Sequence, residues 1–168
     1  GPRLRAQYGC DLVARIGLNS GPVVIGNMGS AQRFNYTFLG DAGNLASRLE
    51  GLNKLFGTPI LVSQATRDLA GPAFAFRKIA RVAVVGRREP VTVFHPMWPR
   101  QWEAGEPIFT AFDEALASFE RGDFQAARTR LEPLAARDVV AARYLHQCDR
   151  LIQTPPTDWN GHWTLTEK

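Results

Sequence analysis

Short runs of apolar, mostly β-branched residues are separated by polar and glycine-rich turns over the first hundred residues. Residues 12–28 contain two such runs with turn residues between them at 19–22, which predicts an antiparallel hairpin. Further strands are expected at 36–39, 59–62, 74–85 and 91–94. Strands interspersed with helical segments and hairpins predict an α+β domain whose sheet is covered by helices on one face.

A helical pattern follows the strand expected at 36–39. Apolar residues recur there at spacings of four, three and four, which places them on one stripe of a helix: Leu45, Leu49, Leu52 and Phe56. Asp41 suits the N-cap of this helix, and Gly57 suits the position just past its end. Ser63 is expected to cap a second, short helix that ends near residue 70.

Beyond residue 97 the pattern is helical. Residues 95–99 break the strand pattern, and three amphipathic helices are predicted after them. Their apolar positions are Phe109, Phe112, Leu116 and Phe119, then Phe124, Ala127, Leu131 and Leu134, then Val140, Tyr144, Cys148 and Leu151. The end of the chain from Thr154 is expected to be irregular, with Trp159 and Trp163 packed onto the body. We therefore divide the chain into a sheet domain, residues 1–97, and a helical extension, residues 98–168.

The two parts also differ in charge. Residues 1–100 carry 13 Lys and Arg against 5 Asp and Glu, whereas residues 101–168 carry 7 against 11. A basic domain attracts nucleic acid or nucleotide phosphates through its field, but an Arg-rich composition gives the same charge without such a partner. The basic part lacks interleaved aromatic residues and a recognition motif, so we expect no nucleic-acid partner.

A hydrophobic content of 45% and a charged content of 21% are typical of a globular protein. The longest apolar run near the middle, residues 82–85, is far shorter than the roughly 20 residues that span a bilayer, so we expect no membrane contact by this segment. We likewise expect no secretory signal in it. Cys10 and Cys148 lie far apart and lack metal-ligand spacing, so they are interpreted as buried or free thiols of a reducing compartment rather than as a disulfide framework.

Glycines cluster in the first thirty residues at Gly17, Gly21, Gly26 and Gly29. No Gly-Lys-Ser/Thr sequence follows them, and their spacing is not that of a dinucleotide-binding fingerprint. We therefore interpret them as positions of close strand approach and turns rather than as a phosphate cradle.

Four motifs occur in order: residues 15–21 (RIGLNSG), 26–30 (GNMGS), 34–41 (FNYTFLGD) and 44–50 (NLASRLE). With these motifs, residues 12–62 resemble the class III nucleotidyl cyclases, the family of adenylate and guanylate cyclases. The resemblance extends more weakly to about residue 97. It implies the ferredoxin-like α+β catalytic fold of that family, here without its N-terminal part.

The resemblance implies an intramolecular reaction in which the ribose 3′-hydroxyl attacks the α-phosphate of ATP and pyrophosphate leaves. Asn44 and Arg48 match the positions that orient the ribose and neutralise the developing charge, where a fixed cation accelerates the step. Their i, i+4 spacing separately places both on one face of the helix, beside the leucine stripe. Without the resemblance, the same pair is an Asn near a helix start and a solvated Arg.

Thr37 matches the family position that recognises the purine, and its hydroxyl can accept a hydrogen bond from the adenine amino group. A threonine there resembles adenylate rather than guanylate cyclases. The alternative is a strand threonine selected for β-propensity. The chain departs from the family at Gly43, where valine is usual, and a glycine in the first turn loosens a helix.

The two metal-binding aspartates and the purine-reading lysine of the family have no match in this chain. Asp11 is the one carboxylate among residues 1–28, and its context does not match. We therefore expect the ligands of Mg²⁺ or Mn²⁺ to lie upstream of this chain, and we expect the chain alone to be inactive.

By the same resemblance we expect ATP as substrate, a homodimer formed through the cyclase domain with a site shared between subunits, and a cytoplasmic location. The helical extension resembles the tetratricopeptide-like tail of bacterial cyclases that carry a membrane-anchored sensor region upstream. A second hypothesis is that the protein is a non-catalytic regulatory or interaction module, which keeps the cyclase fold but has lost the metal-dependent chemistry.

Overall fold

The computed structural model describes residues 2–9, 13–30, 33–84 and 89–164. Cys10, Asp11 and most of the turn expected at 86–90 lie outside these residues. The described helices are α1 (Pro2–Tyr8), α2 (Asp41–Phe56), α3 (Gln64–Ala70), α4 (Pro99–Glu120), α5 (Phe124–Leu131) and α6 (Val139–Gln153), with a 3₁₀ turn η1 (Gly71–Ala73). The strands are β1 (Ile16–Leu18), β2 (Val24–Ser30), β3 (Arg33–Leu39), β4 (Ile60–Ser63), β5 (Ala75–Ala83), β6 (Val91–Met97) and β7 (Trp163–Thr164).

The central sheet has the strand order β1-β4-β6-β5-β7. Strand β1 runs parallel to β4, whereas β6 lies antiparallel to both β4 and β5. The short β7 returns from the far end of the chain and pairs in parallel with β5. The α+β class predicted from the sequence is confirmed, and no helix among the described residues is long and apolar enough to cross a membrane.

The hairpin predicted within residues 12–28 is wrong. Strand β2 pairs with β3, while β1 joins the central sheet. The residues expected to close the hairpin bind helices instead: the Asn19 amide donates to the carbonyl of Ala42, 3.0 Å away, and the Ser20 hydroxyl lies 3.1 Å from that of Thr66. These contacts fix the chain at the sheet edge, from which it continues outward into β2.

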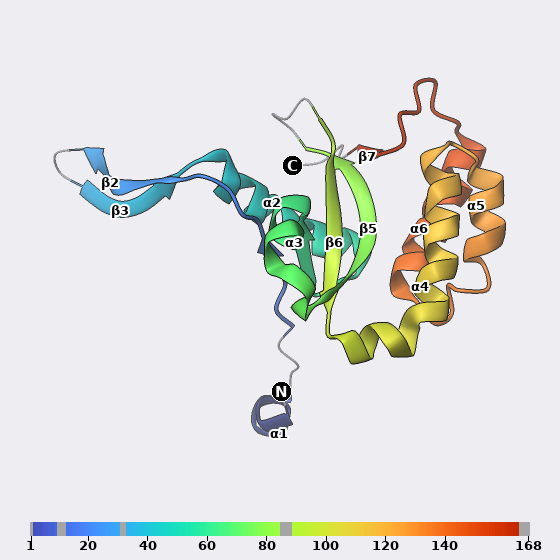
Figure 1. The fold of residues 1–168 in the computed structure, drawn as a ribbon, viewed down its shortest axis with the longest axis horizontal. Coiled ribbons are helices and arrows are strands. Elements are labelled where there is room, and N and C mark those ends of the chain that lie inside the picture. Colours follow the sequence, from blue (N-terminus) through green and yellow to red (C-terminus); the bar gives the residue numbers. More distant parts are fainter. Residues whose placement is uncertain (1, 10–12, 31–32, 85–88, 165–168) are drawn as a thin grey trace.

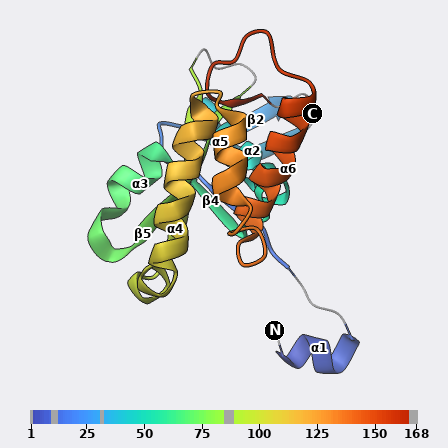
Figure 2. The ribbon, with the colours of Figure 1, turned by 90° about the vertical axis from the view of Figure 1, so that its right-hand side faces the viewer.

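Strands β2 and β3 form a two-stranded arm that projects from the body (Figure 1). Its large side chains are exposed, among them Val24, Ile25, Phe34, Tyr36, Phe38 and Leu39. Helix α1 also lies apart from the body in both views (Figures 1 and 2).

The apolar stripe predicted for α2 is confirmed, because Leu45, Leu49, Leu52 and Phe56 are all buried. The helix ends as expected at Gly57, whose φ of 72° is left-handed. Its N-cap is Gly40 rather than Asp41, because Asp41 already belongs to the helix. A carboxylate in the first turn still interacts favourably with the helix dipole. The Ser63 cap is confirmed by a hydrogen bond from the Thr66 amide to the Ser63 hydroxyl.

Helices α4, α5 and α6 lie side by side (Figure 2) and share one core with α2 and the sheet. Tyr144 of α6 occupies the centre of this core, with aromatic contacts to Phe56, Phe112, Phe119 and Trp163. The Trp159 ring nitrogen donates to the carbonyls of Phe119 and Glu120, each 3.1 Å away. Both C-terminal tryptophans therefore pack onto the body, as predicted. The tetratricopeptide resemblance and the division at residue 97 stay predictions.

Two details differ from the sequence-based prediction. Strand β6 continues through His95 and Pro96 to Met97, so the strand pattern ends later than expected, and α4 begins directly afterwards at Pro99. Helix α3 packs on β4 and β6, where the Arg67 guanidinium lies over the Phe94 ring. Since Phe94 follows the core residue Val93 in an extended strand, α3 covers the sheet face opposite α2, and the helices are not confined to one face.

Consecutive residues of β5 attach the sheet to the tail helices. Arg77 pairs through both Nη atoms with the Asp138 carboxylate, and its guanidinium lies over the rings of Phe109 and Phe112. Lys78 pairs with Glu120, with 2.7 Å between Nζ and Oε1. The Tyr144 hydroxyl donates to the carbonyl of Ile79, 2.8 Å away, where the β5–β6 register shifts.

Candidate functional site

The three residues expected to form the site lie on one strand–turn–helix unit. Thr37 is exposed on β3, where it is paired with Gly26 of β2. Asn44 is exposed in the first turn of α2, and Arg48 follows one turn later, half-buried. Only Gly40 separates β3 from α2, so the strand that carries Thr37 leads directly into the helix that carries the other two.

Gly40 allows this sharp connection. Its φ is 155°, a conformation that residues with a side chain rarely adopt. A Cβ at this position would lie 3.1 Å from the carbonyl oxygen of Pro22. The turn is therefore close to the chain that enters the arm, and a side chain here would displace the start of α2.

The Phe38 ring lies against Gly43, the position where the resemblance predicts valine. A Cβ at Gly43 would lie 2.1 Å from Cε2 of Phe38, so the Phe38 ring occupies the space of the missing side chain. This contact joins the residue after Thr37 to the residue before Asn44. Beside it lies a mostly apolar cavity of about 490 Å³ between the base of the arm and α2, lined by Asn19, Ser20, Gly21, Val23, Ile25, Phe38, Ala42, Gly43 and Ala46.

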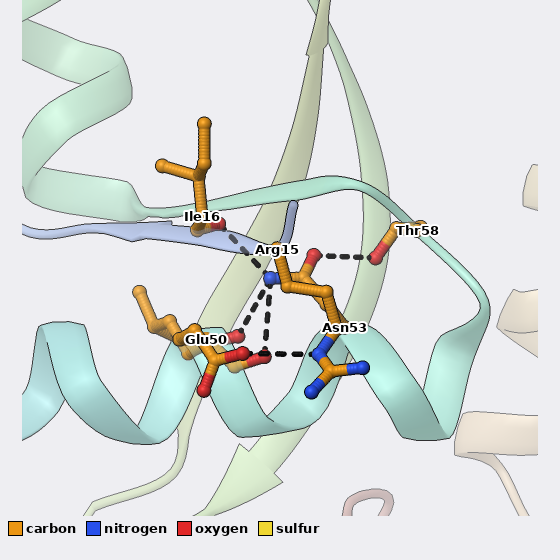
Figure 3. Close-up of polar contacts among 6 residues, drawn as sticks. Arg15, Ile16, Glu50, Asn53 and Thr58 are labelled. Carbon is orange, nitrogen blue, oxygen red and sulfur yellow. Dashed lines mark hydrogen bonds and ion pairs between the residues drawn. The ribbon is translucent and has the colours of Figure 1, made fainter. Parts of the chain in front are cut away.

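Sequence reasoning missed the polar residues that hold α2 against the sheet (Figure 3). Asn53 is buried, and its amide donates to the carbonyl of Ile16, 2.9 Å away. Arg15 pairs with Glu50, with 3.0 Å between Nε and Oε1. A signal was present, because Asn53 lies four residues after Leu49 and thus on the apolar stripe, where a polar side chain needs a partner.

Perturbed ionisable groups lie in the core shared with the tail. Burial raises the pKa of Asp113, against the opposing charges of Arg77 and Lys78. Burial also raises the pKa of Tyr144, and it raises the pKa of the Cys148 thiol to about 12. A thiol with so high a pKa is protonated at neutral pH and unreactive, in agreement with its interpretation as a buried thiol.

The described residues include no group of three or more His, Cys, Asp or Glu that could hold a metal ion. We therefore derive no step through a metal held by this part of the chain. The strand–turn–helix unit carries a cation, an amide and a hydroxyl, and these are groups that in general bind phosphates and hydrogen-bonding ligands.

A family model described as the adenylate and guanylate cyclase catalytic domain matches residues 3–95, more than half of the chain. Adenylate cyclase 1 of Rhizobium meliloti (strain 1021) is 36% identical over 80 residues, which is 48% of this chain and 12% of that protein. An adenylate cyclase of Anabaena cylindrica is 40% identical over 82 residues, 47% of this chain and 16% of that protein. The chain thus spans less than a fifth of the length of these relatives.

Among solved structures, the adenylyl cyclase CyaB from P. aeruginosa is similar, with 32% sequence identity and a TM-score of 0.49. The match covers 57% of this chain and 48% of that one. A bacterial light-regulated adenylyl cyclase matches with 29% identity and a TM-score of 0.43, covering 49% of this chain and 23% of that one.

Proposed function

Because the chain belongs to the adenylate and guanylate cyclase catalytic-domain family, we propose that it is part of an adenylate cyclase that converts ATP to 3′,5′-cyclic AMP and pyrophosphate. The observation that carries the proposal is the strand–turn–helix unit with Thr37, Asn44 and Arg48, which lies inside the matched region. The curated relatives that match about half of the chain are named adenylate cyclases. Their names support ATP as the substrate.

In the proposed reaction the ribose O3′ forms a bond to the α-phosphorus, the bond from that phosphorus to the pyrophosphate oxygen breaks, and the 3′-hydroxyl proton is released. Arg48 would neutralise the charge that gathers on the α-phosphate oxygens. Asn44, one helical turn earlier, would orient the ribose through its amide. Thr37 would accept a hydrogen bond from the adenine amino group and favour ATP over GTP.

The family generally uses divalent metal ions. We propose that Mg²⁺ or Mn²⁺ serves here, held by residues outside this chain, since the described residues include no group of three or more His, Cys, Asp or Glu that could hold it. The ion would polarise the phosphate oxygens. We further infer a cytoplasmic location, where ATP is available.

We also infer that the enzyme is a homodimer through the cyclase domain. The arm exposes large apolar or aromatic side chains on both strands, including Ile25 of β2 and Tyr36 of β3. An isolated two-stranded hairpin is marginally stable in water, and exposed apolar patches mark interaction surfaces. A second copy that covers the arm would stabilise it close to Thr37, so the site would lie beside the subunit contact.

Product analysis tests the proposal. The intact enzyme, supplied with ATP and Mg²⁺ or Mn²⁺, is expected to release cyclic AMP and pyrophosphate in equal amounts, with lower kcat/KM for GTP. A folded protein that forms no cyclic nucleotide from either substrate would support the alternative, a regulatory module that has kept the fold without the chemistry.

A further inference from the structure

Three consecutive residues at the start of the sheet, 15–17, lie against helix α2, and Figure 3 shows the contacts of the first two. Arg15 pairs with Glu50, and the carbonyl of Ile16 accepts from the Asn53 amide at 2.9 Å. Gly17 brings the two backbones together, because a Cβ there would lie 2.2 Å from the carbonyl oxygen of Ala46. We refer to residues 15–17 with their partners on α2 as the β1–α2 clamp.

Asn53 is the polar centre of the clamp and is 1% exposed. Besides the bond to Ile16, its Nδ2 lies 3.2 Å from each of the carbonyl oxygens of Leu49 and Glu50. Its Oδ1 accepts from the Thr58 hydroxyl at 2.9 Å. The amide therefore joins β1, α2 and the turn that leads to β4. An apolar side chain would bury equally well, but it would not specify one position of the helix along the strand.

The clamp lies on the side of α2 away from the proposed catalytic pair. Asn53 and Arg48 are five residues apart, which corresponds to about 140° around the helix and about 7.5 Å along it. A helix of this length moves as a rigid body, so any shift or rotation at Asn53 also moves Arg48 and Asn44. Positions that differ by about 1 Å at a reacting centre change rates by about 100-fold.

We propose that Asn53 is a positioning residue for the cyclisation reaction, holding α2 so that Asn44 and Arg48 face the ribose and α-phosphate. This inference rests on the proposed function. Asn53 itself is buried against β1 and does not contact substrate in the proposed arrangement.

The test is steady-state kinetics of the intact enzyme with Asn53→Asp. This change preserves the shape and the oxygen that accepts from Thr58, but it replaces the donor by an oxygen that faces three carbonyls. We expect kcat for ATP to fall by about 10- to 100-fold, with a much smaller change in KM, because Thr37 lies on β3 outside the clamp. Gly17→Ala is expected to have the same effect, since the added Cβ must push α2 away.

Tyr144→Phe is the matched control. It also removes one buried hydrogen bond from a side chain to a carbonyl, but at Ile79 in the core shared with the tail. We expect a lower thermal midpoint and an unchanged kcat below it. Should Asn53→Asp be unfolded at the assay temperature, Thr58→Val removes only the bond to Oδ1 and is expected to lower kcat by a smaller factor.

The outcomes separate the two proposals. A wild-type enzyme that forms no cyclic nucleotide contradicts the proposed function. If the wild type is active and folded Asn53→Asp keeps the wild-type kcat, the positioning role is overturned and the proposed function stands. The same conclusion follows if folded Thr58→Val and Gly17→Ala both keep the wild-type kcat. An equal loss of kcat in Tyr144→Phe also overturns the positioning role, because the effect would then follow from lost stability.

Discussion

Removing one partner of the buried ion pair between Arg77 and Asp138 is expected to be one of the most destabilising single changes at the sheet–tail contact. Arg77 is 3% exposed, and Asp138 both pairs with it and caps α6 by accepting from the Val140 amide. Removing one partner of such a pair leaves a buried charge and costs about 3–5 kcal/mol. Asp138→Asn removes the charge but keeps a good N-cap, whereas Asp138→Ala loses the cap as well, about 1 kcal/mol more.

Urea denaturation of the chain, followed by circular dichroism and tryptophan fluorescence, measures these costs. The matched control is Glu132→Ala, which breaks the Arg128 pair at a carboxylate that is 61% exposed and is expected to cost far less, because exposed ion pairs contribute little. If Asp138→Asn lowers the free energy of unfolding no more than Glu132→Ala does, breaking the buried pair is no more destabilising than breaking an exposed one, and the reasoning from burial is wrong. A double replacement, Arg77→Met with Asp138→Asn, should recover most of the loss, since no buried charge then remains.

Two further predictions concern the base and the pH dependence. Thr37→Val should raise KM for ATP and reduce the preference for ATP over GTP by about 1–3 kcal/mol, the cost of one lost hydrogen bond. An unchanged ratio of kcat/KM for ATP to kcat/KM for GTP would exclude a role of Thr37 in base recognition. Burial lowers the pKa of His95 from 6.5, and the charge of the nearby Arg77 lowers it further. Below that pH the unfolded chain therefore binds more protons at this residue than the folded chain does. The free energy of unfolding should therefore fall as the pH drops below about 7. In His95→Gln the free energy of unfolding should fall less over the same pH range. If its pH dependence is identical in the variant and the wild type, other groups cause it.

Local patterns predicted the parts of the fold that local forces determine. The stripe on α2, the glycine that ends it and the Ser63 cap are confirmed, because each follows from contacts within a few residues. The pairing of β1 with β4 was not predicted, since it joins Ile16 to Ile60 across a long stretch of sequence. The return of β7 to β5 was missed because it also joins distant residues and because the two residues of β7 carry no strand pattern of their own.

The candidate site residues were predicted from motifs, and the structure adds the contacts that hold the elements carrying them. Thr37, Asn44 and Arg48 were named from the sequence, but their roles depend on the family resemblance. The Phe38 ring over Gly43 could not be anticipated, because it depends on how the arm leaves the helix. Asn53 carried a signal in its place on the apolar stripe, yet its partners on β1 and the turn to β4 become visible only in three dimensions.

The most direct test of the central claim is the turnover of ATP by Arg48→Ala in the intact enzyme. Loss of a preorganised contact to the transition state is expected to lower kcat for cyclic AMP formation by about 100- to 1000-fold, with a much smaller effect on KM. Arg143→Ala, which removes an exposed arginine of α6, serves as the control and should keep wild-type turnover. A folded Arg48→Ala enzyme with wild-type kcat would contradict the account.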